Sequence, residues 1–185
     1  MSSGKVWPSC TSLSPLKRCG KPFCVPRESL MNDKIAKALY RAAALTFEEL
    51  GFMFPSSDLD PLQKYASVDA LGCVDFEGPY TGRLVVRMCG GVLPVLAANM
   101  MGELEPPEQR LQRDALGEVA NIICGNLLPS LAGAKEVFQL KTPRAMAAGE
   151  PLFPVPGTKP TAEVQVGLEE GRADLLLFLI DAPQE

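Results

Sequence analysis

Residues 107–133 form the longest amphipathic segment of the sequence, and this segment constrains the fold more than any other. With about 100° of turn per residue, a helix here gathers its apolar side chains into one wide arc. That arc consists of Val119, Ala120, Ile122, Ile123, Leu127 and Leu131. Because an apolar arc of this width has to be buried, the helix must pack against a sheet or against other helices.

The remaining periodic segments predict what that helix packs against. Apolar residues recur at helical spacing over residues 32–53 and again between Gly91 and Gly102. Alternating segments around turn residues predict two hairpins, formed by 66–77 with 82–89 and by 162–168 with 174–181. Residues 137–140 predict a short strand, and the Pro/Gly-rich residues 143–160 predict a loop. This order predicts an α+β fold class, with an antiparallel sheet packed against long helices.

Net charge divides the chain into two parts. Residues 1–27 contain five Lys or Arg and no acid, so this segment carries +5 and the remaining residues carry −9 of the chain's net −4. The segment is rich in Pro and Ser and lacks apolar periodicity, which predicts a flexible basic extension at 1–27 and a single domain at 28–185. An acidic domain is a poor nucleic-acid binder and favours a basic protein surface as its partner.

Composition also excludes several classes of active site. The chain contains no histidine, which excludes Ser-His-Asp hydrolases, Cys-His nucleophiles and His-dependent metal sites. Cys73, Cys89 and Cys124 lie inside apolar segments and are predicted to be core residues. The sequence has no glycine-rich phosphate loop. Nucleotide binding therefore has no support in the sequence.

Hydropathy predicts the compartment. No apolar run approaches the roughly 18 residues that a membrane helix requires. The first residues also lack the apolar stretch of a secretory signal. We therefore predict a cytoplasmic protein that has no membrane partner.

Opposite its apolar arc, the helix at 107–133 carries a narrow polar stripe. Asp114, Glu118, Asn121 and Gly125 are spaced by four, three and four residues and fall within about 60° of one another. Glycine costs roughly 1 kcal/mol relative to alanine inside a helix, so helix stability does not explain Gly125. Close approach of another backbone would explain it. On its pattern alone, such a stripe is more typical of a solvated helix face than of a catalytic site.

The same residues also carry a family resemblance. The run from Asp114 through Glu118 and Asn121 to Gly125-Asn126 resembles the signature of the CheC/CheX/FliY family of chemotaxis phosphatases. The glycines of residues 76–84 and the segment Leu96–Glu103 resemble the family's hairpin and following helix, in the same order. The resemblance covers residues 31–182 in element order, and it is most specific between residues 74 and 133.

This resemblance implies a phosphatase that acts on the aspartyl phosphate of a phosphorylated CheY-like response regulator. Asn121 would orient the attacking water, and Glu118 would pair with the active-site lysine of the regulator. Asp114 and Gly125 would help the two surfaces to fit. The regulator would supply Mg²⁺, so the phosphatase needs no cofactor. The site would be a convex ridge that the partner completes, and not a deep pocket.

The number of Glu-x-x-Asn motifs in the sequence favours one branch of the family. The first predicted helix has no second Glu-x-x-Asn, since residues 43–50 contain no asparagine. The sequence therefore resembles the single-site member CheX most closely, and this implies a homodimer formed through the sheet. The alternative function is a noncatalytic regulator-binding or flagellar-switch module of the same fold. The intact Glu118/Asn121 pair favours the enzyme, because a scaffold needs no water-orienting amide beside an acid.

Overall fold

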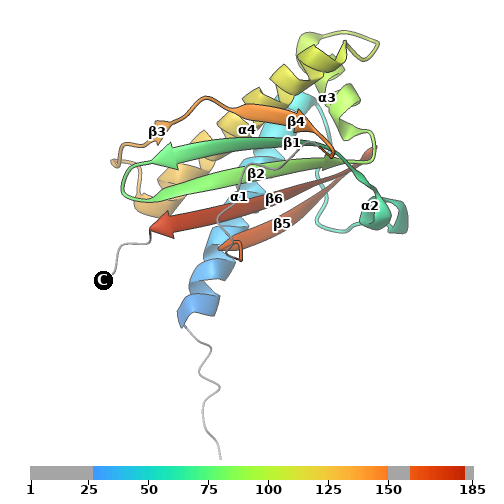
Figure 1. Cartoon of the computed structure of the whole chain (residues 1–185). Helices are drawn as coiled ribbons and strands as arrows, with labels where there is room; N and C mark the ends of the chain where they lie inside the picture. The colour runs from blue at the N-terminus through green and yellow to red at the C-terminus, as the bar shows by residue number, and fades with distance from the viewer. Residues whose placement is uncertain (1–26, 150–158, 182–185) are drawn as a thin grey trace, which may run out of the picture.

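A six-stranded antiparallel sheet forms the centre of the molecule (Figure 1). The computed structural model describes residues 27–149 and 159–181. Its strands are β1 (Val68–Glu77), β2 (Thr81–Cys89), β3 (Gln139–Leu140), β4 (Arg144–Ala147), β5 (Ala162–Leu168) and β6 (Gly171–Asp181). Their order is β3-β1-β2-β6-β5, with β4 also paired to β1. Pairing of β2 with β6 joins the two predicted hairpins into one sheet.

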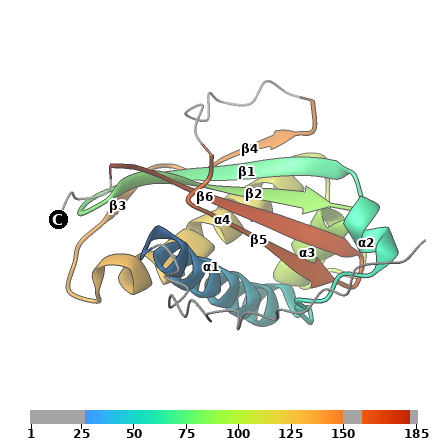
Figure 2. The same cartoon turned by 90° about the horizontal axis from the view of Figure 1, so that it is seen from below.

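The long helices cover one face of this sheet (Figure 2). They are α1 (Arg27–Gly51), α3 (Val92–Met101) and α4 (Gln109–Ala132), and the short α2 (Pro61–Tyr65) lies at one end of the sheet. Here α1 contacts β5 and α4, and α4 contacts β1. The predicted α+β architecture, an antiparallel sheet packed against long helices, is therefore confirmed.

The core lies between the sheet and these helices. Alternate residues of each strand face the helices, and the largest fully buried side chains include Phe47, Leu84, Leu116, Ile123 and Leu175. Each contributes about 1.5–3 kcal/mol through burial. Gly72 lets α4 approach β1 closely, because a Cβ at Gly72 would lie only 3.0 Å from the Leu116 Cγ. The position of α4, which carries the polar stripe, is thus set by its contact with the central strands.

By length and composition, α4 is also apolar enough to cross a membrane. An 18-residue window of α4 has a mean hydropathy of 1.3. Within residues 27–149 and 159–181, α4 is the one helix that is long and apolar enough to cross a membrane. Half of that window is buried inside the fold. The helix has this composition because it packs on both the sheet and α1.

A strand, β4, and a short helix, α2, were not predicted from the sequence. The predicted loop at 143–160 is wrong for residues 144–147, which form β4 and pair with β1. Asp75 of β1 stabilises this pairing by binding Arg83 of β2 and Arg144 of β4, with 2.6 Å between Asp75 Oδ2 and Arg144 Nη2. The other element, α2, begins with a capping box in which the side chains of Asp60 and Gln63 each accept the other's backbone N–H. The predicted extension at 1–27 lies almost entirely outside the described residues.

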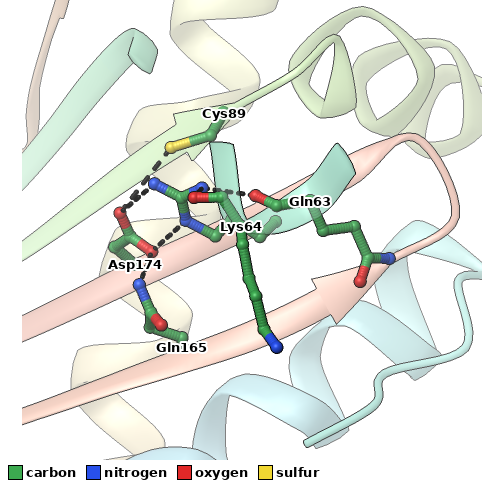
Figure 3. Close-up of polar contacts among 6 residues, drawn as sticks. Gln63, Lys64, Cys89, Gln165 and Asp174 are labelled. Atoms are coloured by element: carbon green, nitrogen blue, oxygen red, sulfur yellow. Dashed lines mark hydrogen bonds and ion pairs between the residues drawn. The ribbon is translucent and has the colours of Figure 1, made fainter. Parts of the chain in front are cut away.

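A buried arginine attaches α2 to the last hairpin (Figure 3). The Arg172 guanidinium donates to the backbone carbonyls of Gln63 and Lys64, which lie at the C-terminal end of α2. It also pairs with Asp174, with 2.7 Å between Arg172 Nε and Asp174 Oδ1. Gln165 and Cys89 donate to the same carboxylate. Each guanidinium nitrogen of Arg172 and both carboxylate oxygens of Asp174 therefore have a partner, as a buried ion pair requires.

The three cysteines of the described chain are buried free thiols, as predicted. Burial raises the pKa of Cys124 to about 12 and that of Cys89 to about 11, from an ordinary value of 9.0. Between about pH 9 and 12 the unfolded chain therefore loses protons that the folded chain keeps, so stability is present below pH 9 and falls as the pH rises.

These thiols are expected to resist alkylation in the folded protein at pH 9, because they are both protonated and inaccessible. Peptide mapping after treatment with iodoacetamide measures this, and the same treatment in guanidinium chloride is the control. Labelling of Cys124 at the same rate in the folded and unfolded protein would contradict its burial.

Candidate functional site

The polar stripe predicted from the sequence forms an outward ridge on α4. Asp114, Glu118 and Gly125 are exposed, and Asn121 is half-buried. On the opposite side of the helix, Val119, Ala120, Ile123 and Leu127 are fully buried against the sheet and α1. The structure therefore brings all four predicted site residues onto one accessible face, as the helical spacing predicts.

The side chains of this ridge have no partners among the described residues. In the part of the chain that the structure describes, Asp114, Glu118 and Asn121 form no side-chain hydrogen bond or ion pair. One carboxylate and one carboxamide are therefore available side by side, three residues apart on the helix. A carboxylate only accepts hydrogen bonds at neutral pH, whereas a carboxamide both donates and accepts. This pair can bind a cationic donor and position a water molecule.

Gly125 has no function in the packing of the protein itself. A Cβ built on Gly125 meets nothing within 4 Å, and the residue does not have a positive φ. Gly117, one turn before Asn121, differs because a Cβ there would contact Pro143 at 3.6 Å. The glycine at 125 thus leaves open space on the outside of the ridge, beside Asn121.

Two grooves lie along α4. The first has a volume of about 590 Å³ and lies between the N-terminal half of α4 and the connection from β3 to β4. Its lining includes Arg110, Arg113, Asp114, Glu118, Thr142 and Pro143. The second, of about 380 Å³, lies between α1 and the C-terminal half of α4, where Lys34 and Arg41 face Asn126 and Ser130. The first groove therefore borders the ridge itself, whereas the second lies farther round the helix from Asn121.

Sequence reasoning missed the cations of these grooves. Arg110 lies four residues before Asp114 and continues the stripe toward the start of α4, so helical spacing could have found it. Lys34 and Arg41 come from α1, and no local pattern relates them to α4. Among the described residues, no group of three or more Cys, Asp or Glu side chains is placed to hold a metal ion.

A family model with the description chemotaxis phosphatase CheX matches residues 70–166, just over half of the chain. The chain belongs to the CheX family. The matched segment runs from β1 to β5 and contains the entire ridge on α4. No curated protein sequence matches the chain.

Solved structures show the same fold. CheX from Desulfovibrio desulfuricans is 20% identical, with a TM-score of 0.64, and the match covers 79% of this chain and 99% of that one. CheX from Borrelia burgdorferi, solved in complex with CheY, BeF₃ and Mg²⁺, is 16% identical, with a TM-score of 0.56 and coverage of 78% and 97%. FliY from Thermotoga maritima is 16% identical, with a TM-score of 0.58 and coverage of 86% and 93%.

These matches confirm the predicted CheC/CheX/FliY family and its fold. Because the sequence identities are low, the likeness to the solved CheX and FliY structures shows the fold of this chain and does not assign its catalytic residues. The catalytic assignment of Glu118 and Asn121 stays a prediction, as do the homodimer and the cytoplasmic location.

Proposed function

We propose that this CheX-family protein hydrolyses the aspartyl phosphate of a CheY-type response regulator, with Glu118 and Asn121 inserted from α4 into the regulator's site. The observation that carries the proposal is the exposed ridge itself. An acid and an amide that have no side-chain partner within the described chain lie one turn apart on it, beside a helical glycine that leaves open space. A surface of this shape suits a site that is completed by a second protein.

In the proposed reaction, a water molecule attacks the phosphorus while the bond from phosphorus to the regulator's aspartate oxygen breaks. Inorganic phosphate and a free aspartate carboxylate result. The Asn121 carboxamide orients the water in line with that bond, accepting a hydrogen bond from the water or donating one to it. Phosphoryl transfer of this kind relies on positioning and charge stabilisation, so the absence of histidine from the chain is no obstacle.

Glu118 acts at the edge of the same site. Its carboxylate pairs with the regulator's active-site lysine through a charge-assisted hydrogen bond, which fixes the register of the two proteins. Asp114 and Gly125 shape the contact on either side of this pair. The regulator supplies Mg²⁺ together with its phosphoryl group. The complex of the Borrelia burgdorferi CheX with CheY, BeF₃ and Mg²⁺ supports a partner of this class.

The proposal is tested by following the loss of a labelled phosphoryl group from CheY-type regulators of the same organism, with and without the protein. Faster loss from at least one regulator is the expected result. Unchanged lifetimes for every regulator would contradict the phosphatase function. Regulator binding without faster loss would instead favour the alternative, a noncatalytic or flagellar-switch module of this fold. Light scattering of the purified protein tests the proposed homodimer.

Gly125→Ala is expected to stabilise the folded protein and to weaken its binding to the regulator. The methyl group has open space in the free protein, and alanine favours a helix by about 0.5–1 kcal/mol over glycine, so the free energy of unfolding should rise. The same methyl group should weaken regulator binding, because it occupies the surface beside Asn121. Urea unfolding and a binding titration measure the two effects. Regulator affinity equal to that of the wild type would place Gly125 outside the contact.

A further inference from the structure

A proline lies inside the helix that carries the ridge. Pro129 belongs to α4, and the helix continues past it, because the Pro129 carbonyl accepts a hydrogen bond from the Gly133 N–H at 3.0 Å. In an α-helix the N–H of residue 129 would bind the carbonyl of residue 125, but proline has no N–H. The Gly125 carbonyl therefore lacks the hydrogen bond that an α-helix normally gives to a carbonyl at this position.

Neither packing nor the end of the helix accounts for this glycine and proline. They are the two least favourable residue types inside a helix. Both Gly125 and Pro129 are exposed, and a Cβ at Gly125 would meet nothing within 4 Å. The helix ends at Gly133, a full turn after the proline, so Pro129 does not terminate it. The buried Leu127 and Leu128 hold this turn against the core, which lets the chain keep both residues despite their cost.

The carbonyl that lacks its helical partner lies beside Asn121. Gly125 follows Asn121 by four residues, which places it about 40° around the helix and about 6 Å along the axis. A proline ring crowds the carbonyl four residues before it, which favours an outward tilt of that carbonyl. Because Gly125 has no Cβ, its own side chain cannot cover the oxygen. The ridge thus presents a main-chain acceptor next to its acid and its amide.

We propose that the Gly125 carbonyl accepts a hydrogen bond from an N–H group of the response regulator, and that Pro129 keeps this carbonyl free for it. The inference rests on the proposed function and adds a main-chain contact to it. Glu118 and the Gly125 carbonyl are both acceptors and lie on either side of Asn121 along the helix. Two donors of the regulator would thus hold the amide in register with the phosphorus. Pro129 is a positioning residue, since it acts through the carbonyl of Gly125.

The kinetic test compares the full-length wild type with Pro129→Ala and Pro129→Gln. Both variants restore an N–H, so the helix can bind the Gly125 carbonyl again. The urea midpoint of unfolding should therefore rise. KM for the phosphorylated regulator should nevertheless rise by about fivefold, which corresponds to one hydrogen bond, while kcat stays close to that of the wild type. The two variants should have equal effects, because they share the N–H and differ in the side chain.

Ser130→Ala is the matched control. Ser130 is exposed on the same turn as Pro129, about 180° around the axis from Asn121. Residue 130 has a backbone N–H before and after the substitution, so KM should not change.

Nuclear magnetic resonance observes the carbonyl directly. The ¹³C shift of the Gly125 carbonyl, detected through the amide of Asn126, should change when a BeF₃-activated regulator binds to the wild type. In Pro129→Ala the shift should already differ in the free protein, because the helix then supplies the donor, and it should change little on binding. A carbonyl shift that stays the same when the wild type binds the regulator would overturn the inference.

The remaining outcomes separate this inference from the phosphatase proposal. Turnover with the wild-type KM in either proline variant, or an equal rise of KM in Ser130→Ala, would overturn the carbonyl contact and leave the phosphatase standing. If the wild type shows no turnover, the phosphatase fails and the affinity for BeF₃-activated regulators decides instead. Weaker binding by the two proline variants alone would then support the contact. Equal binding in all variants, or no binding even by the wild type, would overturn it.

Discussion

Asn121→Ala should reduce the dephosphorylation rate of the regulator by roughly 100- to 1,000-fold, the usual cost of removing one group that acts on the reacting atoms. The amide is the one group of the proposed site that can both donate to and accept from the attacking water. Folding should hardly change, because the Asn121 side chain makes no hydrogen bond within the described chain and alanine is the better helix former. Single-turnover decay of the phosphorylated regulator measures the loss.

Asn126→Ala is the matched control for this variant. Asn126 is exposed on the same helix, but about 140° around the axis from Asn121. Asn126→Ala should leave kcat close to that of the wild type. Asn121→Ala, although slow, should still bind the regulator with largely unchanged affinity. An Asn121→Ala protein as active as the wild type would show that another group positions the water, even if the protein is a phosphatase.

Gly171→Ala should cost about 3 kcal/mol of stability, at the upper end of what an overpacked core position loses. A Cβ at residue 171 would lie 2.1 Å from the Cys89 carbonyl oxygen and 3.1 Å from the Gly90 Cα. These are backbone atoms of β2 and of the turn that follows it, so no side chain can rotate away. The hairpin of β5 and β6 would have to separate from β2, and Arg172 would move with it.

Urea unfolding followed by circular dichroism measures this loss of stability. Gly125→Ala serves as the comparison, since its methyl group enters open space and should stabilise the helix. If the free energy of unfolding of Gly171→Ala lies within about 1 kcal/mol of the wild-type value, β6 can move away from β2 at little cost, and the expected clash at residue 171 is wrong.

The elements that follow from local periodicity agree with the structure. The two long helices and both hairpins were predictable because spacings of two and of three to four residues depend only on backbone geometry. The stripe of Asp114, Glu118, Asn121 and Gly125 follows from the same geometry. An α-helix relates residues three and four positions apart regardless of its surroundings, so their placement on one face required no knowledge of the rest of the fold.

The strand β4 and the groove between α1 and α4 could not be predicted in this way, because contacts between distant segments create them. The strand β4 pairs with β1 and is fixed by the bond from Arg144 to Asp75, and α2 is fixed by Arg172. Lys34 and Arg41 lie beside Asn126 and Ser130 because α1 packs beside α4. Helix packing depends on how side chains from the whole chain fill the core, and no local period encodes it. The chemistry available on α4 is thus a local property of the chain, whereas the charges around it come from tertiary packing.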